Sequence, residues 1–175
     1  MSHPPAPASE HARTLVLGST SRYRRELLER LRVPFIVESP DVDETPLGGE
    51  SPRELALRLA LSKARAVARR HPQAVVIGSD QVADLHGEPL GKPGTHERAL
   101  GQLRRMRGQV VVFQTAVAVV CDATGFEQLE LAPVSVRFRS LEEGLDDAEI
   151  EHYLRVEQPY DCAGAAKSEG LGIAL

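Results

Sequence analysis

Cysteine, tryptophan and aromatic residues are scarce in this sequence. Its 175 residues include two cysteines, no tryptophan and 4% aromatic residues. Cys121 and Cys162 lie far apart and form no C-x-x-C motif, so a disulfide scaffold is excluded as the source of stability. We expect both to be reduced thiols and, with no sign of export, we expect a cytoplasmic protein.

Long apolar runs are also absent. No stretch approaches the roughly 20 residues that span a bilayer, so we expect no membrane insertion. The N-terminal "MSHPPAPASEHAR" lacks the basic start and apolar centre of a signal peptide. Its polar, Pro/Ala-rich composition predicts a disordered tail over residues 1–13, which leaves residues 14–175 as the folded domain.

The charge balance limits the class of ligand. A formal net charge of -4 does not favour a broad surface for a nucleic acid polymer. Arginines nevertheless crowd one segment that holds Arg22, Arg24 and Arg25. A concentrated anion site on a mildly acidic protein indicates a small phosphorylated ligand.

Strand and helix patterns alternate along the chain. Ser21 is a candidate N-cap, and Leu27, Leu28 and Leu31 follow at helical spacing, which predicts an apolar stripe. A capping box begins at Ser51. The pattern predicts strands over residues 15–18, 33–39, 110–120 and 132–140. It also predicts a strand that begins at residue 75 and leads into a hairpin near residue 87. The predicted helices begin at residues 22, 52, 96 and 146. This order predicts an α/β fold on a mixed sheet.

The segment "GSTSRYRREL" places Ser19, Arg24 and Arg25 around a predicted helix N-terminus. Free N–H groups and the helix dipole favour anions there, and guanidinium groups pair with phosphate oxygens. The residues are therefore a candidate triphosphate clamp. The alternative is a capped surface helix with solvated arginines.

Asp80 ends the β-branched run "VVIGSD". Because that strand is expected to be buried, the carboxylate needs a compensating partner or a chemical role. It is a candidate metal ligand or acceptor of a proton from water. The alternative is an aspartate that caps the next turn.

Other charged residues are weaker candidates. Asp41, Asp43 and Glu44 offer hard oxygen ligands for a divalent cation, although acidic loops are often simply solvated. Lys63 lies among apolar neighbours in a predicted helix and either points into a cleft or extends to the surface. Lys92 lies in the turn "GKP".

Eight segments occur in a specific order: "STSRYRREL", "PDVDE", "SPRELALRLALSKA", "IGSDQV", "GKP", "LRRMRG", "QTAVAV" and "EQPYDCAGAAKSEGLGI". This series resembles the Maf family of nucleotide pyrophosphatases from Leu15 to the C-terminus. The resemblance implies a two-lobed α/β fold around a central cleft, like that of inosine-triphosphate pyrophosphatases. It also implies cleavage between the α- and β-phosphates with a divalent metal, Mg²⁺ or Mn²⁺, and a homodimer is a family-level expectation.

The resemblance also implies roles for individual residues. Asp80 would accept the proton of the attacking water or bind the metal, and Glu44 would assist in binding metal or substrate. The residues implied to contact phosphates are Ser19, Arg24, Arg25, Lys63 and Lys92.

Three positions are similar to the branch of the family that hydrolyses 7-methyl-GTP: Tyr23, Gln81 and Glu169. An aromatic ring can stack on a positively charged methylated purine, and a carboxylate can complement its charge. Tyr23 is alternatively a helix-packing residue. The competing functions are a pyrophosphatase for dTTP, UTP or other non-standard nucleotides, and a non-catalytic nucleotide-binding regulator of septum formation.

Two features depart from the family pattern. Ala116 follows Thr115 where members usually carry glycine, which puts a close backbone approach in doubt. Members also continue beyond "SEGLGI" with a strand, a loop and a final helix, so residues 14–175 are expected to lack that C-terminal strand and helix.

Overall fold

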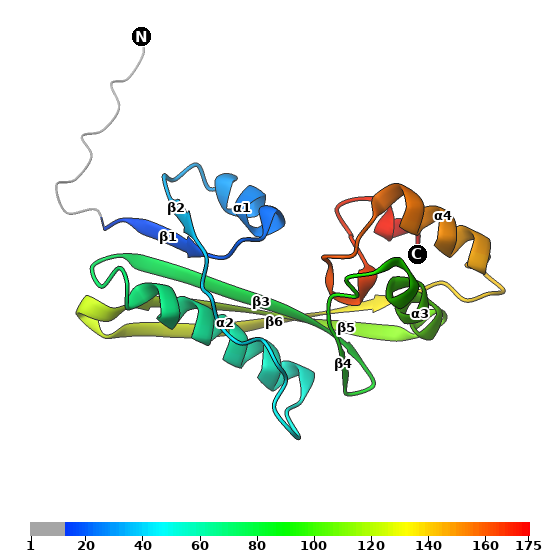
Figure 1. The fold of residues 1–175 in the computed structure, drawn as a ribbon, viewed down its shortest axis with the longest axis horizontal. Helices are drawn as coiled ribbons and strands as arrows, with labels where there is room; N and C mark the ends of the chain where they lie inside the picture. The colour runs from blue at the N-terminus through cyan, green and yellow to red at the C-terminus, as the bar shows by residue number, and fades with distance from the viewer. Residues whose placement is uncertain (1–12) are drawn as a thin grey trace, which may run out of the picture.

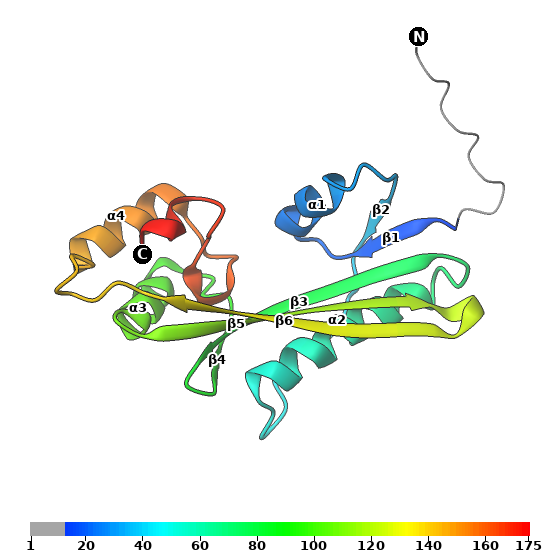
Figure 2. The same cartoon turned by 180° about the vertical axis from the view of Figure 1, so that it is seen from behind.

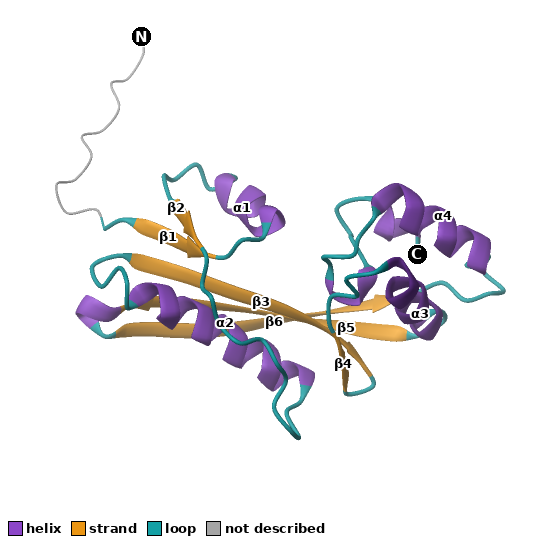
Figure 3. Ribbon diagram, viewed as in Figure 1, coloured by secondary structure: helices purple, strands orange, loops and turns teal. Residues whose placement is uncertain are grey.

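The computed structural model describes residues 13–175, so residues 1–12 of the predicted tail lie outside the described part. The fold is mixed α/β, as the sequence predicts (Figures 1 and 3). Its strands are β1 (Leu15–Gly18), β2 (Ile36–Glu38), β3 (Val75–Leu85), β4 (Glu88–Leu90), β5 (Val110–Cys121) and β6 (Phe126–Arg137). Its α-helices are α1 (Arg22–Glu29), α2 (Pro52–Ala68), α3 (His96–Met106) and α4 (Asp147–Glu157).

One sheet joins the strands in the order β2-β1-β3-β5-β6, and β4 pairs with β3. β1 runs parallel to β2 and β3, whereas β3, β5 and β6 form antiparallel pairs. The predicted mixed sheet is therefore confirmed. Seen from behind, the long strands β3, β5 and β6 run through the molecule and connect its two ends (Figure 2).

Two hydrophobic cores divide the molecule into two lobes. The first core gathers α2 with β1, the first half of β3 and part of β5, including Leu59, Val67 and Val76. The second core gathers α3 and α4 around the other end of the same long strands, including Leu103 and Phe138. Because the strands are shared, the lobes are held in a defined relation by the sheet hydrogen bonds.

The site's location follows from the connections of β1. The crossover through α1 leads from β1 to β2, and the crossover through α2 leads back past β1 to β3. Since parallel crossovers are right-handed, these opposite steps place α1 and α2 on opposite faces of the sheet. The carboxyl end of β1 is therefore a topological switch point, where α/β folds commonly bind ligands.

The predicted caps form at the helix starts. Ser21 accepts from the Arg24 amide at 3.5 Å, and Thr95 accepts from the Arg98 amide at 3.3 Å. At α2, Ser51 and Glu54 complete the capping box in both directions. These bonds satisfy N–H groups that have no partner within the helix.

Two sequence predictions about packing are wrong. Leu27 and Leu31 of the predicted apolar stripe are 50% and 66% exposed, and no residue of α1, all of which is described, is buried. The last strand begins at Phe126, earlier than predicted, and most of its side chains are exposed. β6 is the last strand in the sheet order, and only Leu129 and Leu131 of its side chains pack against the core of the α2 lobe.

Within residues 13–175, no helix is both long enough and apolar enough to cross a membrane.

Candidate active site

Lys63 and Asp80 form a buried ion pair between α2 and β3. The Lys63 ammonium nitrogen lies 2.6 Å from Asp80 Oδ1, and the residues are 3% and 7% exposed. Gly78 allows α2 to approach the strand, because a Cβ there would lie 2.4 Å from the Ala60 carbonyl oxygen. The close helix–strand packing therefore places the lysine directly against the carboxylate.

Glu44 joins this pair from the loop before α2. Its Oε1 lies 2.6 Å from the Lys63 ammonium, and its Oε2 lies 4.0 Å from Lys92. Burial acts to raise the pKa of Glu44, but the hydrogen bond and charge of Lys63, with Lys92 and Arg24, outweigh it and lower the pKa below its usual value. Lys63 thus connects two carboxylates that are far apart in sequence.

Ser19 and Arg24 approach from the switch point. Ser19 follows β1 and is 3% exposed. Its hydroxyl oxygen accepts from the Ser21 amide at 3.2 Å and from the Arg24 guanidinium at 3.4 Å. Burial lowers the pKa of Arg24, while the charges of Asp80 and Glu44 act to raise it. The N-terminus of α1 therefore turns one arginine toward the two acids.

Arg25 lies apart from this cluster. Its guanidinium donates to Glu29 at 2.9 Å, one turn along α1, and its side chain is 61% exposed. With Glu29 and Val33–Val37 it lines an open hollow of about 450 Å³ formed by α1 and the segment that enters β2. Neighbouring helix positions point in different directions, so the structure brings Arg24 to the acids and leaves Arg25 at the surface.

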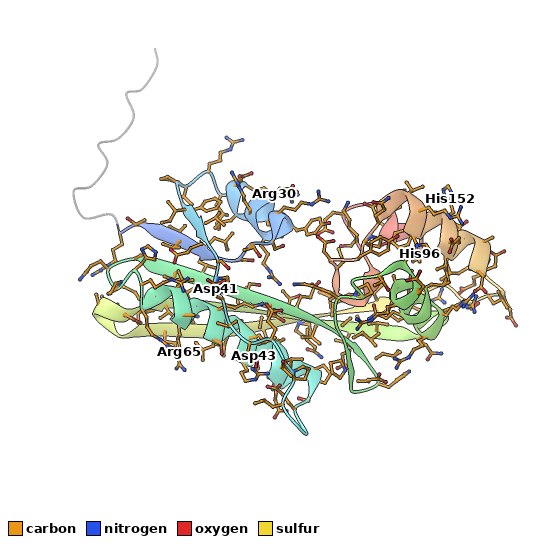
Figure 4. All side chains as sticks on the ribbon, viewed as in Figure 1. Arg30, Asp41, Asp43, Arg65, His96 and His152 are labelled. Carbon is orange, nitrogen blue, oxygen red and sulfur yellow. The ribbon has the colours of Figure 1, made fainter. Side chains whose placement is uncertain are left out.

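Of the three candidate metal ligands in the acidic loop, only Glu44 joins the Lys63–Asp80 pair. Asp41 accepts from the Ser39 hydroxyl at 2.6 Å, and Asp43 accepts from the Thr45 amide at 2.9 Å. Both lie on the segment that leads into α2, distant from His96 and His152 in the other lobe (Figure 4). They shape the loop locally, while Glu44 extends to Lys63.

The chemistry of the donor set fits a divalent cation shared with a substrate. Within the described residues, no cluster of three or more His, Cys, Asp or Glu side chains forms a ready-made metal site. Mg²⁺ is commonly held by one or two carboxylates together with substrate phosphates rather than by a protein cage. Glu44 and Asp80, joined by Lys63, provide two such carboxylates.

The three residues predicted to read the base lie at different places. Tyr23 is on α1 and faces the C-terminal segment, where the Lys167 ammonium lies 5.7 Å from its ring centroid. Glu169 lies on that segment, close enough to help raise the pKa of Cys162, which burial mainly raises to about 11. Gln81 lies on β3, beside Asp80, and donates to the Thr115 hydroxyl at 2.8 Å. Tyr23 thus contacts the segment that carries Glu169, through Lys167.

Comparison with known proteins identifies the family. The Maf family model, described as Maf-like protein, matches residues 14–175. The chain belongs to the Maf family. Three curated relatives carry the name 7-methyl-GTP pyrophosphatase. The protein of Polaromonas sp. is 75% identical over 94% of this chain and 73% of its own length. The protein of Albidiferax ferrireducens is 66% identical over 93% of this chain and 80% of its own length. The protein of Cupriavidus pinatubonensis is 57% identical over 92% of this chain and 79% of its own length.

Among solved structures, the Staphylococcus aureus Ham1 protein aligns over 71% of each chain, with 18% identity and a TM-score of 0.49. This similarity is too distant to indicate anything about the site.

Ala116 occupies the position where Maf proteins were expected to carry glycine. It pairs with Asp80 across β3 and β5 and is fully buried in the core of the α2 lobe. Because paired residues of neighbouring strands share a face of the sheet, the methyl group packs in that core on the same face as Asp80.

Sequence reasoning missed two residues of this Maf-family chain, Glu157 and Lys167. They form an ion pair beside Tyr23. Both residues lie in the quoted segment "EQPYDCAGAAKSEGLGI", but the sequence does not show that they pair, because the contact joins the end of α4 to an irregular segment. The one signal in the sequence was Lys167 itself, a charged residue that follows a Gly/Ala-rich turn.

Proposed function

We propose that this chain is a nucleoside triphosphate pyrophosphatase that hydrolyses the α–β phosphate bond of 7-methyl-GTP to 7-methyl-GMP and pyrophosphate. The observation that carries the proposal is the convergence of Lys63, Asp80 and Glu44 at the switch point of the sheet. The names of relatives at 75%, 66% and 57% identity support the substrate.

The cationic side chains are proposed to bind the triphosphate. Lys92 lies 4.0 Å from Glu44, the charges of Asp80 and Glu44 act on Arg24, and Ser19 accepts from the Arg24 guanidinium. Phosphoryl transfer depends mainly on positioning and on neutralising negative charge, which these groups provide. The resemblance also assigns a phosphate contact to Arg25, which requires its side chain to leave Glu29.

Asp80 is proposed to orient the attacking water and to accept its proton. The water oxygen forms a bond to the α-phosphorus, the bond to the bridging oxygen breaks, and pyrophosphate leaves with the bond electrons. Lys63 fixes the Asp80 carboxylate from the α2 side. A carboxylate held in this way acts as a general base without having to reorganise during the reaction.

Glu44 and Asp80 are the residues proposed to hold Mg²⁺ or Mn²⁺. When bound, the cation supplies positive charge at the phosphate oxygens. The arrangement leaves two roles open to Asp80, as ligand and as proton acceptor, and metal titration of the Asp80→Asn variant distinguishes them.

Recognition of the base is proposed to involve Tyr23, Gln81 and Glu169. The Tyr23 ring offers an apolar face for stacking on a cationic purine. The Glu169 carboxylate can accept from the guanine N1–H and N2–H₂ edge. A small-molecule substrate, a cytoplasmic location and a homodimer remain part of the same proposal.

The deciding experiment measures pyrophosphate release from 7-methyl-GTP, GTP, UTP and dTTP with Mg²⁺ and with Mn²⁺. We expect 7-methyl-GTP to give the highest kcat/KM. Higher kcat/KM with UTP or dTTP would assign the chain to the other enzymatic branch. Nucleotide binding without any release would favour the non-catalytic regulator.

A further inference from the structure

The ion pair of Glu157 and Lys167 lies where the two lobes meet. Glu157 ends α4, and its Oε1 pairs with the Lys167 ammonium. The two side chains are 11% and 17% exposed, so the pair is largely shielded from water. An ion pair in such a place is much less screened than one at the surface.

Glu157 also holds the backbone of the segment that carries Glu169. Its Oε2 accepts from the Leu171 amide at 2.8 Å. Gly170 packs so closely on the carboxylate that a Cβ there would lie 2.3 Å from Oε2. On the preceding side, the Tyr153 hydroxyl accepts from the Lys167 amide at 3.0 Å and donates to the Ala165 carbonyl at 2.9 Å. Residues 165–171 are thus fixed to α4 at several points.

Lys167 reaches from this segment to the aromatic ring of the other lobe. Its ammonium lies 5.7 Å from the Tyr23 ring centroid, within the range of a cation–π contact. Figures 1 and 2 show α1 and the C-terminal segment facing each other. The Tyr23 ring therefore already has a cation near it before any nucleotide binds.

This arrangement poses an electrostatic problem for a cationic base. A 7-methylguanine ring carries positive charge, so an unpaired lysine beside Tyr23 would repel it and compete for the ring. Arg22 adds a second cation, 4.9 Å from the same centroid. Among the acids, the charge of Asp161 acts on Tyr23 itself, and Glu157 acts on both cations, Lys167 and Arg22. Of these, Glu157 contacts the Lys167 ammonium directly.

We propose that Glu157 is a specificity-positioning residue: it neutralises Lys167 and fixes the Glu169 segment, so that the Tyr23 ring accepts a positively charged purine in preference to a neutral one. This inference rests on the proposed 7-methyl-GTP activity. It assigns the discrimination between 7-methyl-GTP and GTP to a partly buried ion pair as well as to the residues that touch the base.

The test compares Glu157→Gln, Lys167→Met and the double variant. Glutamine retains an acceptor for the Leu171 amide but no longer cancels the lysine charge. We expect the preference for 7-methyl-GTP over GTP, as a ratio of kcat/KM, to fall about tenfold in Glu157→Gln, mainly through the KM for 7-methyl-GTP. The double variant should recover most of the preference, because the uncompensated cation is gone.

Binding of 7-methyl-GMP and of GMP, measured by calorimetry, gives a readout that does not depend on catalysis, and it should show the same loss and recovery. Glu151→Gln is the matched control, since Glu151 lies on the same helix but pairs with His96 and Arg155. Equal losses for both nucleotides, or no recovery in the double variant, would indicate a purely structural role and overturn the inference. A parent chain that does not prefer 7-methyl-GTP would overturn the proposed function as well.

Discussion

The Lys63 ammonium lies 2.6 Å from Asp80 Oδ1, and both residues are less than one tenth exposed. Neither charge can be well solvated by water at that depth, so each depends on the other and on Glu44 for compensation. The same contact that fixes the proposed general base is therefore also part of the stability of the fold.

Lys63→Met should destabilise the protein. The substitution leaves Asp80 as a buried carboxylate without its cation, which costs about 3–5 kcal/mol in comparable buried pairs. Urea unfolding at neutral pH measures the difference. Arg65→Met is the control, because Arg65 is on the same helix but pairs with Glu127 at the surface, and we expect it to cost less than about 1 kcal/mol. Similar midpoints for the two variants would contradict the prediction.

Asp80→Asn should remove turnover while nucleotide binding is largely kept. Asparagine has nearly the same shape but cannot accept the proton, so kcat should fall at least about 100-fold. Single-turnover kinetics and calorimetric binding of a non-hydrolysable analogue check the two parts. Asp84→Asn serves as control, because Asp84 lies on the same strand and accepts from the Gly87 amide at 2.7 Å. Retained turnover in Asp80→Asn would show that a group other than Asp80 accepts the proton.

Gly78→Ala should separate α2 from β3. The new methyl group would lie 2.4 Å from the Ala60 carbonyl oxygen and 2.5 Å from the Ala64 amide nitrogen, both of which are backbone atoms that cannot rotate away. We expect a loss of about 1–3 kcal/mol or more, together with reduced activity because Lys63 moves with its helix. Thermal unfolding and pyrophosphate release measure both effects.

The comparison variant for that experiment is Gly101→Ala. Gly101 lies inside α3, and apart from the backbone of that helix and the adjacent residues no atom lies within 4 Å of an added Cβ. Alanine there should stabilise the protein by up to about 1 kcal/mol, since it favours the helix. A destabilised Gly101→Ala or an unaffected Gly78→Ala would refute the packing argument.

Glu44→Gln should change the dependence of stability on pH. The pKa of Glu44 is lowered in the folded protein, so its carboxylate contributes stability above the unfolded pKa of about 4.5 and loses that contribution as the pH falls through the lower folded value. The difference in unfolding free energy between parent and variant should be constant from pH 7 to pH 5 and shrink below about pH 4.5. Unfolding titrations between pH 3 and pH 7 measure this difference in free energy. A difference that grows as the pH falls would contradict the prediction.

Local features of the fold could be predicted from the sequence because their causes are local. Ser21, Ser51 and Thr95 cap helices through hydrogen bonds to amides three residues away. The β-branched run at Val75 forms a buried strand because its alternating side chains meet a helix on one face. The order of the motifs also identified the family, which the match over residues 14–175 confirms.

Other properties were decided by the tertiary structure. Arg24 and Arg25 are adjacent and chemically identical, yet one lies beside the acids and the other pairs with Glu29, because a helix turns by about 100° per residue and only the packed fold determines which direction faces the site. Lys63 became a bridge between Glu44 and Asp80 because Gly78 brings α2 against β3. The strength of an interaction between two charges depends on their separation in space and not along the chain. In this protein the sheet and the helix packed on it set that separation.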